Sequence, residues 1–282
     1  MKAHFFSLAD TLVAALRGDE LLLMSIGAEC SDFVRLNHAK IRQAGRVTQA
    51  SLSLELILAQ KHASASIVLS GRVEEDRQRA MSALLSLRDQ LPLLPDDPHL
   101  LYNTEVSSTN QEGVDHLPVA ADAIDELITS SAGTDLVGIW ASGEIAKGFA
   151  NSLGQRNWFS TFNFHLDWSL YHQQDKASKN SYAGTTWKAK DFERRMAVAR
   201  RDLEVLAQPA RTISPGKYRV YLAPAALHEV VELLSWGGFG LKAHRSKVSP
   251  LMRAVEGSAQ FDERFCLDEH AAAGQSASFN SK

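Results

Sequence analysis

The stretch WFSTFNFHLDWSL, residues 158–170, decides the fold class of this chain. Its side chains alternate between two kinds. Large apolar side chains occupy one parity: Trp158, Phe162, Phe164, Leu166, Trp168 and Leu170. Polar side chains occupy most of the other parity: Thr161, Asn163, His165, Asp167 and Ser169. Because successive residues of a strand point to opposite faces, this pattern predicts a strand in a sheet with one buried and one wetter face.

Extended runs also precede and follow this strand. Residues 21–70 contain apolar and alternating runs whose connections are too short for crossover helices, which predicts an antiparallel meander. We expect Gly27 and Asn37-His38 to form turns between short strands, and Gly45 to form a turn or a bulge. Residues 136–140 predict one more buried strand, and residues 181–190 a further extended piece.

Helical spacing appears between these extended runs. Residues 73–91 place apolar side chains on one face and acidic ones in the first turn, and prolines follow. Residues 118–129 predict a second helix. Residues 191–206 predict the clearest one, with apolar residues at i, i+4, i+7, i+11 and i+14. The first residues of the chain predict a short amphipathic helix.

A break containing proline and glycine at residues 209–216 predicts a domain boundary. Beyond it, residues 217–222 predict a strand, and Pro224 opens a helix with an apolar face. We therefore expect an α+β protein. Residues 1–208 would form a domain of antiparallel sheet with packed helices, and residues 209–282 would begin a mostly β second domain.

Composition narrows the class of protein. The 282 residues include 30 basic and 33 acidic ones, a formal net charge of −3, so we expect no nucleic acid as the main partner. Two cysteines lie far apart, which disfavours a disulfide scaffold and favours a reducing compartment. No apolar run approaches the roughly 20 residues of a membrane span. The first residues also lack the apolar core of a signal peptide. We expect a cytoplasmic protein without membrane contact.

One short motif contains residue types that could act on a metal ion: His228-Glu229-Val230-Val231-Glu232-Leu233. A zinc hydrolase uses histidines as ligands and a nearby glutamate to deprotonate the bound water. His228 and Glu232, one helical turn apart, could supply two ligands, and Glu229 the general base. Nothing nearby clearly offers a third ligand. The alternative interpretation is an amphipathic helix whose polar side carries these three residues.

Two other pairs of residues could bind a ligand. His244 and Arg245 follow a glycine-rich turn and could hold a carboxylate or phosphate, although a flexible loop explains them equally well. His165 and Asp167 lie on the polar side of the long strand and could line a cleft, or be ordinary polar surface residues. The serines lack the GxSxG elbow of a hydrolase. The residues alone leave the function undecided.

Several stretches together resemble the TldD/PmbA family, also called the modulator-of-DNA-gyrase family. Residues 45–50 are similar to its arginine-centred strand, and residues 151–154 (NSLG) to its N-S-x-G turn. Residues 216–226 match the pattern G-x-Y-x-V-x-L-x-P-x-A that leads into its second domain. Residues 276–279 lie near where members approach a later strand. Members run well beyond 282 residues, so the chain is expected to hold a first domain and an incomplete metallopeptidase-like β domain.

The resemblance also implies a function. Active members are zinc peptidases with HExxxH and a much later cysteine ligand. His228 and Glu229 match the start of that motif, but Leu233 replaces its second histidine, and Cys266 comes too early to be the late ligand. This pattern is similar to the PmbA/TldE branch, which lacks the zinc site and pairs with a zinc-bearing TldD subunit.

The resemblance therefore implies a non-catalytic partner subunit in the proteolysis of unfolded peptides, either with a TldD-like subunit or as a homodimer. We expect no cofactor in this chain, and zinc only if the divergent site is active. The candidate peptide-binding residues are His165, Asp167, His244 and Arg245. Two alternatives stay open: an active zinc metallopeptidase that uses His228, Glu229 and Glu232, and a regulatory protein that acts on DNA gyrase.

Overall fold

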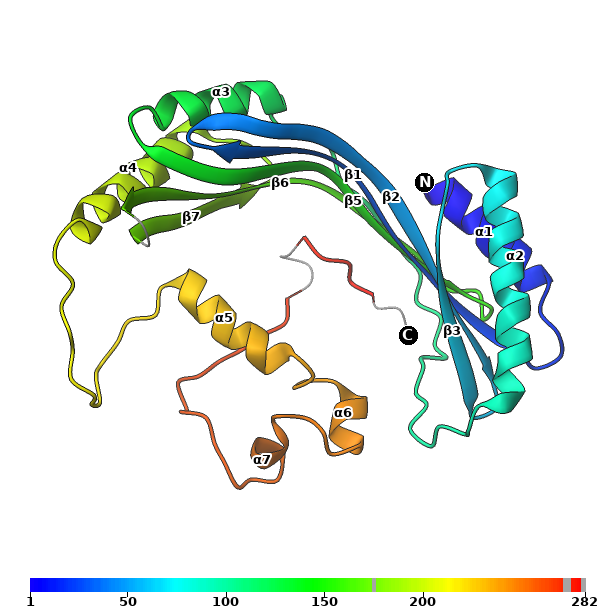
Figure 1. Cartoon of the computed structure of the whole chain (residues 1–282). Coiled ribbons are helices and arrows are strands. Elements are labelled where there is room, and N and C mark those ends of the chain that lie inside the picture. Colours follow the sequence, from blue (N-terminus) through cyan, green and yellow to red (C-terminus); the bar gives the residue numbers. More distant parts are fainter. Residues whose placement is uncertain (174–175, 271–274, 280–282) are drawn as a thin grey trace.

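The computed structural model describes residues 1–173, 176–270 and 275–279 (Figure 1). Helices and strands follow one another along the chain in this order: α1 (Lys2–Ala14), β1 (Leu21–Asn37), β2 (Lys40–Leu58), β3 (Lys61–Val68), α2 (Val73–Gln90), the 3-10 turn η1 (Leu91–Leu93), β4 (Thr109–Glu112), α3 (Ala120–Ser130), β5 (Asp135–Asn151), β6 (Arg156–Gln173), β7 (Lys176–Gly184), α4 (Ala189–Leu206), α5 (Pro224–Ser235), α6 (Leu241–Arg245) and α7 (Met252–Val255). The prediction of an α+β fold is confirmed.

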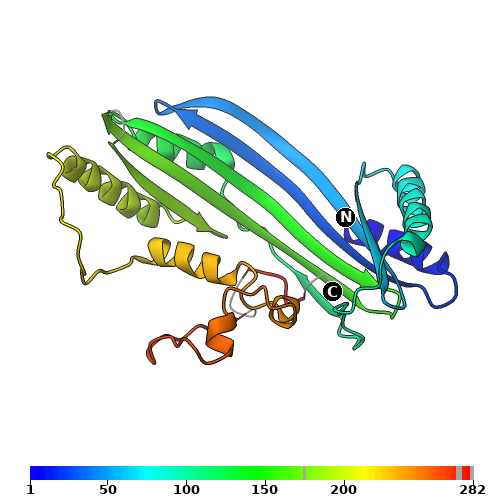
Figure 2. The same ribbon diagram turned by 60° about the horizontal axis from the view of Figure 1, so that its bottom comes forward.

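The seven strands form one sheet in the order β3-β2-β1-β5-β6, with β4 and β7 both on the outer side of β6. β4 pairs with β6 in parallel, and the other strand pairs are antiparallel. Four strands, β1, β2, β5 and β6, have 17 to 19 residues each. Their length and twist give the sheet the shape of an arch (Figures 1 and 2).

The predicted meander exists, but its strands are longer than expected. The turn at Asn37-His38 is confirmed: His38 and Ala39 both have positive φ, as a two-residue hairpin requires. The predictions of turns at Gly27 and Gly45 are wrong, since both residues lie inside long paired strands, and the irregularity in this hairpin falls between Arg35 and Leu36. Both glycines lie on the face of the sheet opposite the packed helices: Gly27 directly follows Ile26, whose side chain is in a core, and Gly45 pairs with Phe33 of the same odd parity in β1. A small residue on that less buried face imitates a turn sequence.

Two helix pairs cover the same face of the sheet at its opposite ends. α1 and α2 pack on Leu22, Met24 and Ile26 of β1, whereas α3 and α4 pack over Val34 and Leu36 of the same strand. All five residues have even numbers, so both hydrophobic cores lie on one face of β1. Figure 1 shows this to be the convex face of the arch. The other face, the concave face, therefore carries the odd-numbered residues of β1, β5 and β6.

The alternation in residues 158–170 behaves as predicted. Trp168, Leu166 and Phe164 are buried in the core under α3 and α4, and the ring of Phe164 stacks on Trp140 at 5.2 Å between centroids. His165 on the opposite parity is exposed. The predicted helices also form, as α1, α2, α3, α4 and α5, and the predicted starts and ends differ from the observed ones by at most two residues.

Residues after α4 differ most from the sequence predictions. The strand predicted at 217–222 does not form: these residues are exposed and pair with no other strand, and a strand without a partner leaves its backbone groups unsatisfied. The described part of 209–282 contains α5, α6 and α7 and no strand. The boundary at residue 208 and a mostly β second domain stay predictions.

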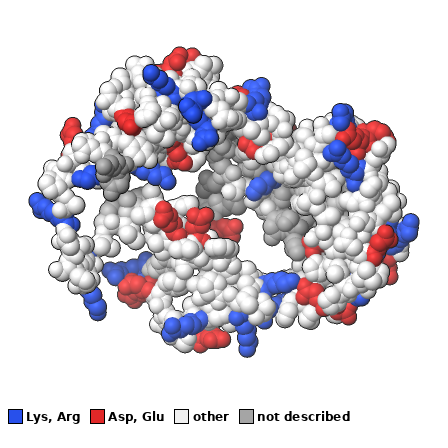
Figure 3. All heavy atoms as spheres, viewed as in Figure 1, with Lys and Arg blue, Asp and Glu red and all other residues white. Residues whose placement is uncertain are grey.

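The segment that carries α5, α6 and α7 lies opposite the concave face of the sheet (Figure 1). Contacts between described residues join it to the arch. Lys242 Nζ lies 2.7 Å from Asp97 Oδ2, and Phe279 packs against a small cluster formed by Leu23, Ile57 and Phe149 on the concave face. Figure 3 shows openings between this segment and the sheet. Among the described residues, every helix is too short or too polar to cross a lipid bilayer.

Candidate functional site

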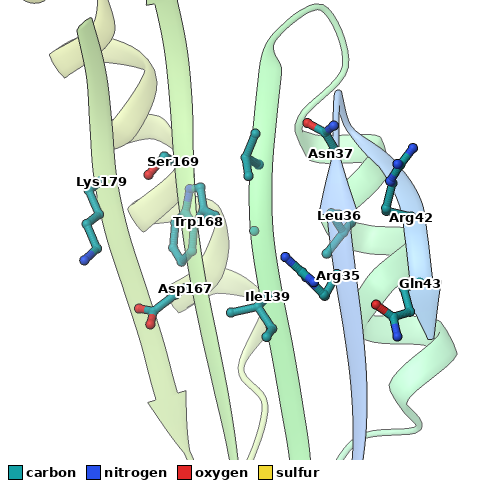
Figure 4. A pocket seen from close by; sticks show the side chains of 12 residues that line it. Arg35, Leu36, Asn37, Arg42, Gln43, Ile139, Asp167, Trp168, Ser169 and Lys179 are labelled. Carbon is teal, nitrogen blue, oxygen red and sulfur yellow. The ribbon is translucent and has the colours of Figure 1, made fainter. Parts of the chain in front are cut away.

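An open hollow of about 940 Å³ lies on the concave face, at the end of the sheet near the β1–β2 turn. Five strands contribute to its lining, which Figure 4 shows from close by: Arg35, Leu36, Asn37, Arg42, Gln43, Val137, Gly138, Ile139, Asp167, Trp168, Ser169 and Lys179. The hollow therefore combines aliphatic side chains of β5 with charged groups from the strands on both sides of it. Such a mixture can hold a ligand that is apolar and charged at once.

Strand register places the charged groups of the hollow. Ile139 on β5 has Arg35 of β1 as its neighbour on one side and Asp167 of β6 on the other. Ser169 of β6 in turn pairs with Lys179 of β7. Residues opposite each other in neighbouring strands share a face, so these side chains all rise from the concave surface. In Figure 4 the Arg35 side chain extends from β1 toward Ile139.

The predicted pair His165 and Asp167 lies on this concave face. His165 Nε2 is 3.6 Å from Asp167 Oδ1, and the two side chains are 55% and 38% exposed. Asp167 lines the hollow, whereas His165 is not among the lining residues. The prediction that both residues occupy the wetter face is confirmed. Their role in peptide binding stays a prediction.

The predicted metal ligands lie on a different surface. His228 Nδ1 is 3.9 Å from Glu232 Oε2 across one turn of α5, and both side chains are more than two thirds exposed, at 76% and 72%. Glu229 and Glu232 line a second open hollow together with Leu233, Ser235 and Trp236. Figure 3 shows acidic side chains gathered on α5. The two hollows share no lining residue.

These donors do not fit a zinc ion. Leu233 occupies the position of the second histidine and offers only hydrocarbon, so α5 supplies two donors where zinc sites use at least three protein ligands. Within residues 1–173, 176–270 and 275–279, no group of three or more His, Cys, Asp or Glu side chains is placed to hold a metal ion. We therefore derive no catalytic step through zinc in this chain.

His244 and Arg245 end the short helix α6. His244 Nε2 donates to the carbonyl oxygen of Gly238 at 2.6 Å, and Ser249 Oγ donates to the same oxygen at 2.8 Å. His244 thus closes the glycine-rich turn onto α6, while Arg245 is exposed. The structure gives His244 a contact within its own loop. The prediction that these two residues bind peptide stays a prediction.

Sequence reasoning missed most residues of the first hollow. Arg35, Arg42, Val137, Ile139 and Lys179 come from four strands, and the hairpin β1–β2 is far in sequence from β5 and β7. Only the strand order and register bring them together. The alternation in each strand was a usable signal for which face a residue occupies, but it carries no information about which strands are neighbours.

Known proteins resemble this chain in fold but not detectably in sequence. No protein-family model matches the chain, and no curated protein matches it. The fold is similar to the solved structure of a proposed modulator of a DNA gyrase from Thermotoga maritima MSB8, with a TM-score of 0.63 at 15% sequence identity. It is also similar to TldE from Thermococcus kodakarensis, with a TM-score of 0.51 at 10% identity. The chain shares the fold of these two proteins.

The length of the match differs between the chains. The likeness to the Thermotoga maritima protein covers 88% of this chain and 58% of that one. The likeness to TldE from Thermococcus kodakarensis covers 72% of this chain and 47% of that one. The chain therefore spans about half the length of the solved structures it resembles. At these identities the likeness concerns the fold, and function requires a separate argument.

Proposed function

We propose that the chain belongs to the TldD/PmbA family and acts as a non-catalytic, TldE-like partner of a zinc-bearing TldD subunit in the proteolysis of unfolded peptides. The observation that carries the proposal is Leu233, which stands where an active member needs its second histidine ligand. The fold shared with TldE from Thermococcus kodakarensis supports the same assignment.

The exposure of the α5 pair agrees with a non-catalytic role. A catalytic zinc lies in a site whose surroundings orient its ligands and limit the access of water. His228 and Glu232 instead lie largely in solvent, 3.9 Å from each other. An ion pair with that exposure contributes little to stability, so the pair is explained as part of the polar side of α5.

The concave face is the surface we assign to peptide. It is hollowed, it contains exposed aliphatic side chains between charged ones, and Figure 3 shows openings that reach it past the segment with α5. An extended segment can contact such a surface through its side chains without having to unfold further. A folded protein exposes few extended segments. Binding through such segments would therefore restrict the surface to unfolded substrates.

Zinc content and complex formation test the proposal. The purified chain should contain far less than one zinc per molecule, and should co-elute in size-exclusion chromatography with a cognate subunit that carries HExxxH. Stoichiometric zinc that is lost in His228→Ala would favour an active metallopeptidase with a divergent site. Recovery of DNA gyrase, and no peptidase subunit, by the immobilised chain would favour a regulatory protein.

A further inference from the structure

We infer that the hollow on the concave face selects acidic peptide segments, in which carboxylates alternate with large aliphatic side chains. This inference rests on the proposed function and names the class of peptide that the same face would bind. Three observations carry it: the charge of the lining, the lack of partners for its cations among the described residues, and the exposed aliphatic floor.

The lining carries an excess of positive charge in a chain whose net charge is negative. Among the described residues, the basic side chains of the lining are Arg35, Arg42 and Lys179, and the acidic one is Asp167. The whole chain has 33 acidic and 30 basic residues, so the charge of the lining has the opposite sign to that of the chain. Cations grouped around a concave surface attract carboxylates at distances up to about a Debye length, roughly 10 Å at 0.1 M salt.

The three cations have no partner within the described residues. None of the side chains of Arg35, Arg42 and Lys179 makes a hydrogen bond or ion pair there. Other arginines of the same sheet are paired, as when Arg46 makes a two-pronged contact with Asp32 at 2.7 and 2.9 Å. With respect to the described residues, the guanidinium groups of the hollow thus have their donors available for a carboxylate from outside.

The floor of the hollow supplies the apolar part. Val137 and Ile139 of β5 are 37% and 44% exposed, although they lie within a central strand of the sheet. Covering exposed aliphatic surface with an apolar side chain is favourable because it removes that surface from water. The neighbours of Ile139 across the strands are Arg35 and Asp167, so an aliphatic side chain bound there has charged groups on both sides.

A peptide fits this combination better than a nucleic acid. Nucleic acids need a long basic track and, for single strands, aromatic side chains on which bases can stack. Trp168 belongs to the lining but is only 1% exposed, so the accessible floor is aliphatic, and the described lining has three cations. An acidic peptide supplies both a carboxylate for the cations and a side chain such as leucine for the floor.

The test measures binding of labelled unstructured peptides to the full chain by fluorescence anisotropy. Three peptides of equal length are compared, in which leucine alternates with glutamate, lysine or serine. We expect the glutamate peptide to bind at least 10-fold more tightly than the lysine peptide, and to lose this advantage as NaCl rises from 50 to 500 mM. A single-stranded oligonucleotide of the same net charge should compete weakly.

Variants locate the interaction. Arg35→Gln and Lys179→Gln should each weaken glutamate-peptide binding roughly 2- to 5-fold, the effect of losing one exposed ion pair, and the double variant more. Arg201→Gln, at an exposed arginine of α4 outside the hollow, is the matched control and should leave the Kd unchanged. Circular dichroism before each titration confirms that the variants fold, which the exposure of these side chains leads us to expect.

The outcomes separate this inference from the proposed function. Equal affinity for all three peptides, or an equal loss in Arg201→Gln, would overturn the charge selectivity and leave peptide binding intact. Efficient displacement by the oligonucleotide would overturn the choice of peptide as the ligand. Failure of every peptide to bind would overturn both the inference and the peptide-binding part of the proposed function.

Discussion

The ammonium group of Lys242 lies 2.7 Å from Oδ2 of Asp97 and joins α6 to the loop after η1, across 145 positions of the chain. The carboxylate of Asp97 also accepts the backbone N–H of His99 at 2.8 Å and contacts Nε2 of His62 at 3.2 Å. These donors, with Lys242 as the strongest, lower the pKa of Asp97 to about 2. Asp97 thus anchors the segment after α5 to the arch as long as it stays ionised.

The first prediction follows from the sign of that shift. The folded-state pKa of Asp97 lies below its ordinary value of 3.8, so its contribution is complete above about pH 4 and is lost as the pH falls toward 2. Limited proteolysis within residues 209–223 should therefore accelerate over that pH window. In the variant Lys242→Gln, cleavage within residues 209–223 should already be fast at pH 7. Lys247→Gln, an exposed control in the same segment, should behave as the unaltered chain does; equal cleavage of both variants would show that the ion pair is not an anchor.

A second prediction concerns burial of an ion pair. Arg88 contacts both carboxylate oxygens of Glu20 at 2.6 and 2.8 Å, with side-chain exposures of only 12% and 8%. Removing Arg88 leaves Glu20, whose pKa the hydrogen bond from Arg88 lowers, without its main partner. Arg88→Ala should lower the free energy of unfolding by about 2–4 kcal/mol in urea denaturation.

Arg264 provides the matched comparison for Arg88. It contacts both oxygens of Asp262 with similar geometry, at 2.7 and 2.9 Å, but the two side chains are 85% and 56% exposed. Arg264→Ala should change the free energy of unfolding by less than about 0.5 kcal/mol. Similar losses in the two variants would mean that burial does not determine the strength of these pairs.

The third prediction concerns two glycines within the sheet. At Gly143 of β5, a Cβ atom would overlap the carbonyl oxygen of Cys30 and lie 2.6 Å from the Cα atom of Ser31. Gly143→Ala should therefore destabilise the protein by about 2–3 kcal/mol, because the paired backbones of β1 and β5 would have to separate. At Gly27 of β1 nothing lies within 4 Å, so Gly27→Ala should be neutral or stabilising by about 0.5 kcal/mol. Thermal denaturation followed by circular dichroism compares the two variants, and the reverse order would refute the register between β1 and β5.

Local pattern predicted the elements with one dominant face. The alternation in residues 158–170 identified β6 and its buried side, and the apolar spacing in residues 191–206 identified α4. Prediction from the local pattern failed where side chains are not buried. Gly27 and Gly45 lie on the concave face, opposite the packed helices, and residues 217–222 have strand-forming side chains but no neighbouring strand in the described part of the chain. A strand depends on its partners, and these are set by long-range contacts.

In the candidate site too, some residues could be placed from the sequence and others could not. His165 and Asp167 could be placed on one face because they belong to one strand, and His228 and Glu232 on one side of a helix because they are one turn apart. Arg35, Ile139 and Lys179 could not be related to each other, since each belongs to a different strand. Their common face appears only when the order β2-β1-β5-β6-β7 is known.

The most direct test of the non-catalytic assignment is cleavage of a labelled unfolded peptide by three samples: this chain alone, an HExxxH-bearing partner alone, and the mixture. Glu229 is the residue of α5 that the motif assigns as general base, so Glu229→Gln is tested in each sample that contains the chain. We predict cleavage by the mixture above that of the partner alone, none by the chain alone, and no effect of Glu229→Gln. Cleavage by the isolated chain that is abolished in Glu229→Gln would contradict the assignment.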